Sequence, residues 1–151
     1  KKILPTLKSR CLIFKINLSY VECLNIANLL ISRNVMDLIN KDLISHYNTP
    51  GDFIKLVDFA DEKKIDLKEQ SIESFINLLI DNGYYKKNKL VKQLLINFIE
   101  LFFLKEYKLR TAKTSLLNIY QNFINKINNT EKFNLDEESL FLEFKSKLLN
   151  G

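Results

Sequence analysis

Apolar residues recur along most of this chain at intervals of three and four positions, as they do on the buried side of a helix. This spacing predicts helices over residues 20–32, 34–46, 51–64, 68–81, 87–107, 111–128 and 136–149. The segment Cys11–Ile16 differs, because it is a short run of mainly apolar, β-branched and aromatic residues that predicts a buried strand. The pattern therefore predicts a mainly α fold with one strand remnant near the start.

Polar residues at the ends of these patterns mark where helices begin. Ser19 followed by Glu22 fits a capping box, and Asn34 is a candidate cap for the next helix. The strongest turn signal has Thr49 as a cap and Pro50 at the first helical position, where its missing N–H is tolerated. We therefore expect helices to start directly after these residues.

A polar link at residues 61–67 is the best candidate for a boundary between two helical units. In the second unit, residues 90–104 are apolar on most sides of their helix, so we expect several neighbours to bury it. Two interpretations of that apolar surface stay open. In the first, part of it forms a subunit interface; in the second, the helix is the centre of a monomeric bundle.

The composition excludes only a few classes of protein. The chain has 151 residues, 46% of them hydrophobic, which is enough to bury a core without disulfides or metal. The net charge of +5 permits an anionic partner without showing one, because the lysines look spread over solvated helix faces. Cys11 and Cys23 make no disulfide framework, and His46 alone cannot complete a metal site. No apolar stretch is long enough to cross a bilayer, so we expect a cytoplasmic protein that does not contact membranes.

Few residues suggest chemistry of their own. The sequence contains neither a glycine-rich phosphate loop nor a recognisable catalytic triad. His46 is interpreted as a helix-end residue, and the carboxylates at 58, 61 and 62 as solvated helix-end charge. Residues 84–87 and 105–113 mix aromatic and basic side chains. This mixture is compatible with contact to nucleic acid. An ordinary helix–loop–helix surface explains it equally well with fewer assumptions.

The start of the chain carries a family resemblance. Leu4-Pro5-Thr6, then Ser9-Arg10-Cys11, then the apolar strand segment, resembles the Ser-Arg-Cys region of bacterial DNA polymerase III clamp-loader subunits, which are AAA+ proteins. The resemblance implies that residues 1–18 end an AAA+ nucleotide-binding domain, that 19–66 form a small helical lid domain, and that 67–151 form a helical collar domain for oligomerisation. It also implies that the chain begins at the tail of a larger domain.

One position departs from the family pattern. In ATP-binding members the turn equivalent to Thr49-Pro50-Gly51 is followed by a sensor arginine, whereas this chain has Asp52 there. A carboxylate would repel a γ-phosphate. The departure favours the delta-prime class of subunit, which resembles its ATPase neighbours but does not hydrolyse ATP. No cofactor is then expected in this chain, because the neighbouring subunits bind the ATP.

The resemblance also implies roles for the motif. Arg10 would be an arginine finger, offered in trans to the ATP of a neighbouring subunit, with Ser9 fixing the turn and Cys11 buried behind it. Judged without the resemblance, Arg10 is a surface arginine at a helix end. The implied partners are the other clamp-loader subunits and, through the assembly, the sliding clamp and primer-template DNA.

The residues leave two alternatives open. The chain could be a stand-alone helical protein-interaction domain, or the C-terminal part of an ATP-hydrolysing clamp-loader subunit. No catalytic activity is expected of this stretch itself, although the assembly it would join belongs to the DNA polymerase III holoenzyme.

Overall fold

The computed structural model describes residues 17–45, 47–109, 113–133 and 136–146. Within these ranges the chain forms eight α-helices and one 3₁₀ helix, and no strand. The elements are α2 (Tyr20–Ile31), α3 (Val35–Leu38), η1 (Lys41–Leu43), α4 (Pro50–Lys63), α5 (Ile72–Asp81), α6 (Tyr84–Lys87), α7 (Lys89–Leu109), α8 (Lys113–Phe133) and α9 (Glu138–Phe144). The prediction of a mainly α fold is confirmed, while the predicted strand at residues 11–16 lies outside the described part.

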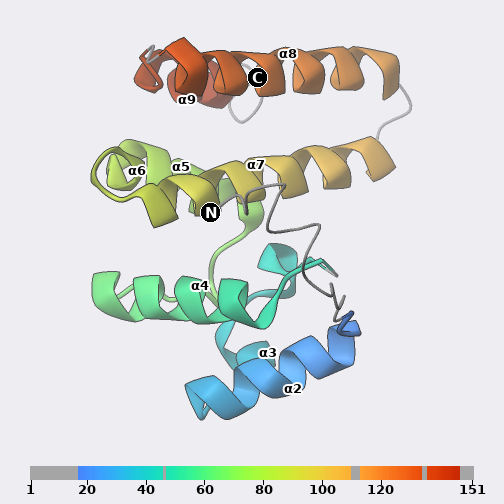
Figure 1. Cartoon of the computed structure of the whole chain (residues 1–151), viewed down its shortest axis with the longest axis vertical. Helices are drawn as coiled ribbons and strands as arrows, with labels where there is room; N and C mark the ends of the chain where they lie inside the picture. Colours follow the sequence, from blue (N-terminus) through green and yellow to red (C-terminus); the bar gives the residue numbers. More distant parts are fainter. Residues whose placement is uncertain (1–16, 46, 110–112, 134–135, 147–151) are drawn as a thin grey trace, which may run out of the picture.

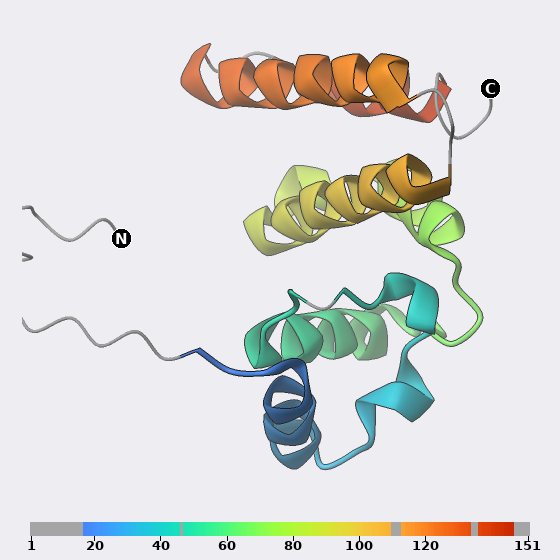
Figure 2. The ribbon, with the colours of Figure 1, turned by 90° about the vertical axis from the view of Figure 1, so that its right-hand side faces the viewer.

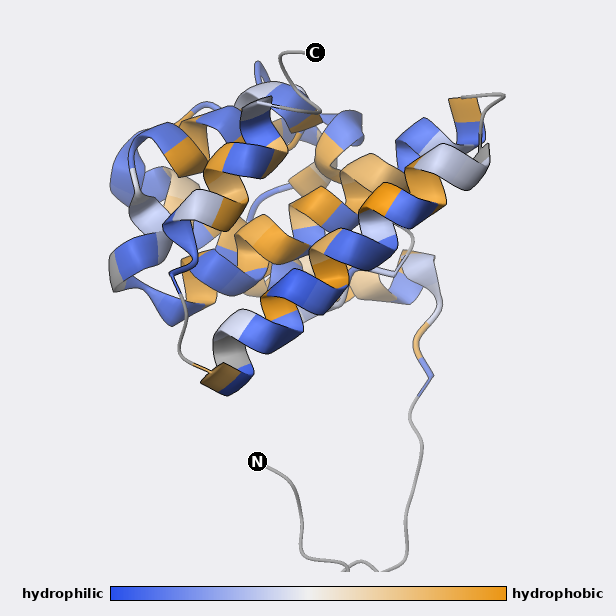
Figure 3. Cartoon of the chain, turned by 90° about the horizontal axis from the view of Figure 1, so that it is seen from above, coloured by the Kyte–Doolittle hydropathy of each residue, from blue (hydrophilic) through white to orange (hydrophobic). Residues whose placement is uncertain are grey.

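The helices are stacked in layers along the long axis of the molecule (Figure 1). α2 and α3 lie at one end, followed by α4, then by α5, α6 and α7, and finally by α8 and α9. The view turned by 90° shows the same order (Figure 2). The layers are in contact, since α2 packs on α4, α4 on α7, and α7 on α8. The long helices carry stripes of apolar and polar positions that match this packing (Figure 3).

Helix α7 is the central element of the stack. It packs against α4, α5, α6 and α8, so the predicted burial of this helix on several sides is confirmed. Ring contacts join it to α5 in its own layer and to α8 in the next one: Phe98 lies 5.0 Å from Phe75 of α5, and Phe103 lies 5.1 Å from Tyr120 of α8, between ring centroids. The buried side chains of α7 are Val91, Leu94, Leu95, Ile96, Phe98, Ile99, Phe102 and Phe103.

A single hydrophobic cluster joins the two helical units predicted from the sequence. It extends from Ala27 in α2 to Phe144 in α9. The division into 19–66 and 67–151 stays a prediction, but these two groups of helices share a core.

The predicted helix starts at Ser19 and Asn34 are confirmed. The Ser19 hydroxyl accepts a hydrogen bond from the Glu22 N–H at 3.3 Å, and the Ser19 N–H donates to the Glu22 carboxylate at 2.7 Å. These hydrogen bonds from Ser19 lower the pKa of Glu22. The Asn34 side chain accepts from the N–H of Met36 at 3.2 Å. Local sequence is enough for these caps, because donor and acceptor lie within three residues of each other.

The predicted single helix over residues 34–46 is wrong, because the chain breaks between α3 and η1. The break lies at Asn40, whose backbone N–H donates to the carbonyl of Leu67 at 3.1 Å. Its side-chain amide also donates to the carbonyl of Lys68 at 3.0 Å. Hydrogen bonds to the link after α4 therefore replace helical ones, and hydrophobic periodicity carries no information about them.

Helix α5 starts later than predicted, at Ile72 instead of residue 68. The hydroxyl of Ser71 accepts from the N–H of Ser74 at 3.1 Å and caps the helix there. After α5 the chain turns at Gly83, whose φ of +60° is a conformation that side-chain-bearing residues rarely adopt. This turn leads directly into α6.

The outer helices bury less of their apolar surface than the periodicity predicts. α2 lies in the end layer and buries only the small side chains of Cys23 and Ala27. α8 is also an outer helix, so one flank lacks a covering layer. Large apolar side chains of these helices are exposed, among them Val21 and Leu30 in α2 and Leu117 and Ile119 in α8.

The carboxylate of Asp42 joins three segments that are distant in sequence. It lies in η1, accepts a hydrogen bond from the Ile72 N–H at the start of α5 at 3.1 Å, and forms an ion pair with Lys105 of α7. The Lys105 ammonium also donates to the Asp42 carbonyl at 2.5 Å. Burial alone would raise the pKa of Asp42, but the hydrogen bonds from Lys105 and Ile72 and the positive charge of Lys105 hold it below its ordinary value.

We expect Asp42→Asn to lower the free energy of unfolding by about 1 kcal/mol at pH 7, since this charge-assisted contact is partly exposed. The folded pKa of Asp42 is depressed, so its contribution is present above the ordinary value of 3.8 and is lost as pH falls through the folded pKa. The difference from wild type should therefore shrink below about pH 4. Urea unfolding at pH 7 and pH 3 measures it.

Asp58→Asn is the matched control, because Asp58 is an exposed acid on α4. An equal loss of stability in Asp58→Asn, or a gap that is unchanged at pH 3, would contradict the role of Asp42.

Candidate functional site

The residues predicted to act on ATP in trans, Ser9, Arg10 and Cys11, lie outside the described part of the chain, as does His46. Their roles therefore stay predictions. The described residues nevertheless test the other sequence candidates, and they contain pockets that the sequence did not reveal.

The turn before α4 is built as predicted, and it engages Asp52. The Asp52 carboxylate accepts from the Thr49 N–H at 2.9 Å and from the Thr49 hydroxyl at 2.8 Å. The Asp52 N–H donates back to the Thr49 hydroxyl at 3.3 Å. This capping box places negative charge at the N-terminus of a helix, where it is favoured by the helix dipole and would repel a phosphate.

The aromatic and basic stretch at residues 84–87 contributes to the core. Tyr85 is buried and its ring lies 4.7 Å from that of Phe141, between centroids. Tyr84 packs edge-on against Phe59 at 5.5 Å. Neither ring is therefore available as a stacking platform for a nucleic-acid base.

One basic residue of each candidate stretch has an intramolecular partner. Lys86 pairs with Glu138 at 2.7 Å, and Lys105 pairs with Asp42. The net charge is also less evenly spread than it first looks. Residues 1–16 hold five of the 23 Lys and Arg residues and none of the 18 acids, so residues 17–151 carry equal numbers of both signs. The helical part therefore has no net positive charge that would attract nucleic acid.

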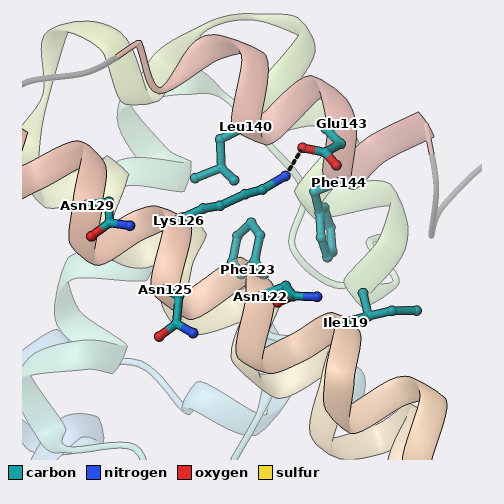
Figure 4. Close-up of a pocket in the computed structure, with 9 residues that line it drawn as sticks. All are labelled: Ile119, Asn122, Phe123, Asn125, Lys126, Asn129, Leu140, Glu143 and Phe144. Atoms are coloured by element: carbon teal, nitrogen blue, oxygen red, sulfur yellow. Dashed lines mark hydrogen bonds and ion pairs between the residues drawn. The ribbon is translucent and has the colours of Figure 1, made fainter.

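A pocket of about 370 Å³ lies between α8 and α9 (Figure 4). Lys126 crosses it from α8 and pairs with Glu143 of α9 at 2.6 Å. This internal pair balances the charge of the pocket, and the lining contains amide groups but no nucleophile paired with a base. The lining residues are Ile119, Asn122, Phe123, Asn125, Lys126, Asn129, Leu140, Glu143 and Phe144.

Two further pockets, each of about 210 Å³, flank the exposed edge of α7. Glu100 and Leu104 line both of them. The first lies between α7 and residues 43–56 and includes Asp52 and the exposed ring of Tyr47. The second, which we call the Glu100 pocket, lies between α7 and α8. Its lining is Glu100, Phe103, Leu104, Tyr107, Leu116, Leu117 and Tyr120.

Glu100 is a candidate site residue that the sequence pattern did not indicate. Burial by its apolar neighbours raises the pKa of Glu100 above its ordinary value. Burial, and then the negative charge of Glu100, also raise the pKa of Tyr120. The available signal was a lone carboxylate within the most apolar stretch of the sequence, at residues 94–104.

The described residues contain no group of three or more His, Cys, Asp or Glu side chains that could hold a metal ion. None of the described helices is both long enough and apolar enough to cross a membrane. Comparisons with protein families, curated proteins and solved structures gave no match for this chain.

We expect Thr49→Ala to destabilise the protein by about 1 kcal/mol, because the hydroxyl that accepts from the Asp52 N–H and donates to the Asp52 carboxylate is lost, whereas the backbone N–H of residue 49 remains. Thr49→Ser keeps the hydroxyl and should stay within a few tenths of a kcal/mol of wild type. Thermal unfolding followed by circular dichroism measures both. Equal losses in the two variants would mean that the hydroxyl is not the stabilising group.

Proposed function

We propose that this chain is part of a non-hydrolysing, delta-prime-type subunit of the bacterial DNA polymerase III clamp loader. The observation that carries the proposal is Asp52. At the position of the family's sensor arginine, this carboxylate caps α4 through Thr49 and leaves negative charge where a nucleotide phosphate would have to bind. The resemblance around Ser9-Arg10-Cys11 adds support, as does the position of the two longest helices, α7 and α8, after residue 67.

In this proposal the helices assemble the subunit and Arg10 acts on its neighbour. A guanidinium is always charged and presents a planar fork of donors that fits phosphate oxygens. Supplied in trans, it stabilises the charge that builds on the transferring phosphoryl group, so that hydrolysis depends on correct assembly. Ser9 and Cys11 position the arginine.

The proposed partners are the other clamp-loader subunits, joined through the collar helices after residue 67. Contact with the sliding clamp and with primer-template DNA comes through the assembly, and ATP is bound by neighbouring subunits. DNA replication places such a subunit in the bacterial cytoplasm. Packing of the aromatic rings at residues 84–85 against Phe59 and Phe141 agrees with DNA being bound elsewhere in the assembly.

A second candidate, a stand-alone helical interaction domain, is favoured by the contacts between the two helical units. The family pattern has a lid and a separate collar, whereas Asn40 here donates to Leu67, and Asp42 pairs with Lys105, across the predicted boundary. The hydrophobic core shared by the two helical units also favours a single domain. Binding separates the candidates: the whole chain should bind the other clamp-loader subunits in a pull-down with purified components, and no binding would favour the second candidate.

We expect Arg10→Ala, made in the full-length protein and assembled with its partners, to lower DNA-dependent ATP hydrolysis. Arg10→Lys should fail similarly, because an ammonium lacks the planar fork. Arg33→Ala is the matched control, since Arg33 is an exposed arginine that pairs with Asp61 on α4. Steady-state ATPase assays measure all three. Unchanged hydrolysis in an assembled Arg10→Ala complex would refute the finger role.

A further inference from the structure

We propose that the Glu100 pocket binds the guanidinium group of an arginine side chain presented by a partner protein. The pocket lies between two helices, α7 and α8, in the described part of the chain. The proposal is independent of the clamp-loader assignment, because it depends only on the pocket lining from α7 and α8.

Counted over the described residues, the charge of the pocket is negative. Glu100 is the only described charged residue that lines it, and no described Lys or Arg pairs with this carboxylate. Many other acids of the described part have a basic partner, for example Asp61 with Arg33 and Glu143 with Lys126. Among its described lining residues, the adjoining pocket adds Asp52 and no basic residue. A cation is therefore the complementary ligand.

Aromatic rings form the walls beside this carboxylate. Phe103, Tyr107 and Tyr120 line the pocket, and the Phe103 and Tyr120 rings are packed edge-on with centroids 5.1 Å apart. Leu104 and Leu117 at its rim are 39% and 42% exposed, so the pocket is reachable from solvent. Phe103 is buried, whereas Tyr107 and Tyr120 are half-buried, so a guanidinium can stack on the two tyrosine rings while its N–H groups point to the carboxylate.

Glu100 is exposed at this pocket, and its apolar neighbours nevertheless raise the pKa of the carboxyl group because they remove part of its hydration. A bidentate guanidinium would satisfy both carboxylate oxygens.

Size and hydration favour an arginine side chain over other cations. The volume of about 210 Å³ is below the roughly 300–1,000 Å³ that drug-sized ligands occupy. A lysine ammonium is compact and strongly hydrated, whereas a guanidinium is flat, more weakly hydrated and suited to aromatic walls. Lys105, the nearest basic residue of α7 in sequence, already pairs with Asp42. Arg33, the only arginine in the described part of the chain, pairs with Asp61, so we assign the guanidinium to a partner.

The test uses the whole chain and three short peptides, acetyl-Gly-Arg-Gly-amide and its lysine and citrulline counterparts. Citrulline keeps the shape of arginine but has no charge. In NMR titrations, the arginine peptide should shift the ring signals of Tyr107 and Tyr120 with a dissociation constant of about 1–10 mM, typical of a single side chain. The citrulline and lysine peptides should bind about tenfold more weakly or worse.

Variants show whether the carboxylate and the ring act as proposed. Glu100→Gln should weaken arginine-peptide binding about tenfold, while Glu73→Gln, an exposed acid on α5, should leave it unchanged. Tyr120→Phe should retain binding and Tyr120→Leu should lose it, because the ring and not the hydroxyl forms the wall. Thermal unfolding of each variant shows that it is folded.

Four results would overturn the proposal. Equal binding of the citrulline peptide would show a purely apolar pocket, and equal binding of the lysine peptide would rule out guanidinium selectivity. Unchanged binding in Glu100→Gln would remove the carboxylate from the site. A sedimentation change in Glu100→Gln without peptide would show that a second copy of the chain occupies the pocket.

Discussion

The rest of the structure depends on the burial of α7. Apolar side chains surround most of this helix, and each side left in water would weaken the hydrophobic driving force for folding. The layers above and below it, and the short helices beside it, satisfy that requirement together. The phenylalanines at 98 and 103 extend the contact by packing against rings of α5 and α8.

A set of polar contacts fixes how the first helices sit on that core. Hydrophobic contact is not directional, so it does not by itself determine the orientation of the layer containing α4. Asp42 fixes this orientation, because its carboxylate accepts a hydrogen bond from the N–H of Ile72 and forms an ion pair with Lys105. Asn40 adds two hydrogen bonds to the link at Leu67 and Lys68. The two helical units are therefore joined by directional contacts as well as by a shared core.

Asp52 and Glu100 show how environment separates two carboxylates that line the same pocket. Asp52 is satisfied by the N–H and hydroxyl of Thr49 and stabilises the start of α4. Glu100 has apolar and aromatic neighbours, no basic partner among the described residues, and a raised pKa. The first therefore acts in folding, whereas the second remains available to a ligand. For this reason the function proposed from Asp52 and the ligand proposed for Glu100 are separate hypotheses.

The sequence by itself determined the features that depend on near neighbours. The caps at Ser19, Asn34 and Thr49 follow from residues at most three positions apart, and the burial of α7 follows from its own composition. The tertiary structure decided the helix break at Asn40, the Asp42 contacts, the exposed flanks of α2 and α8, and the pocket at Glu100. Each of these joins residues that are distant along the chain or depends on which faces the neighbouring layers cover. Hydrophobic periodicity shows that a face is apolar, but only the packed layers determine whether another helix covers it.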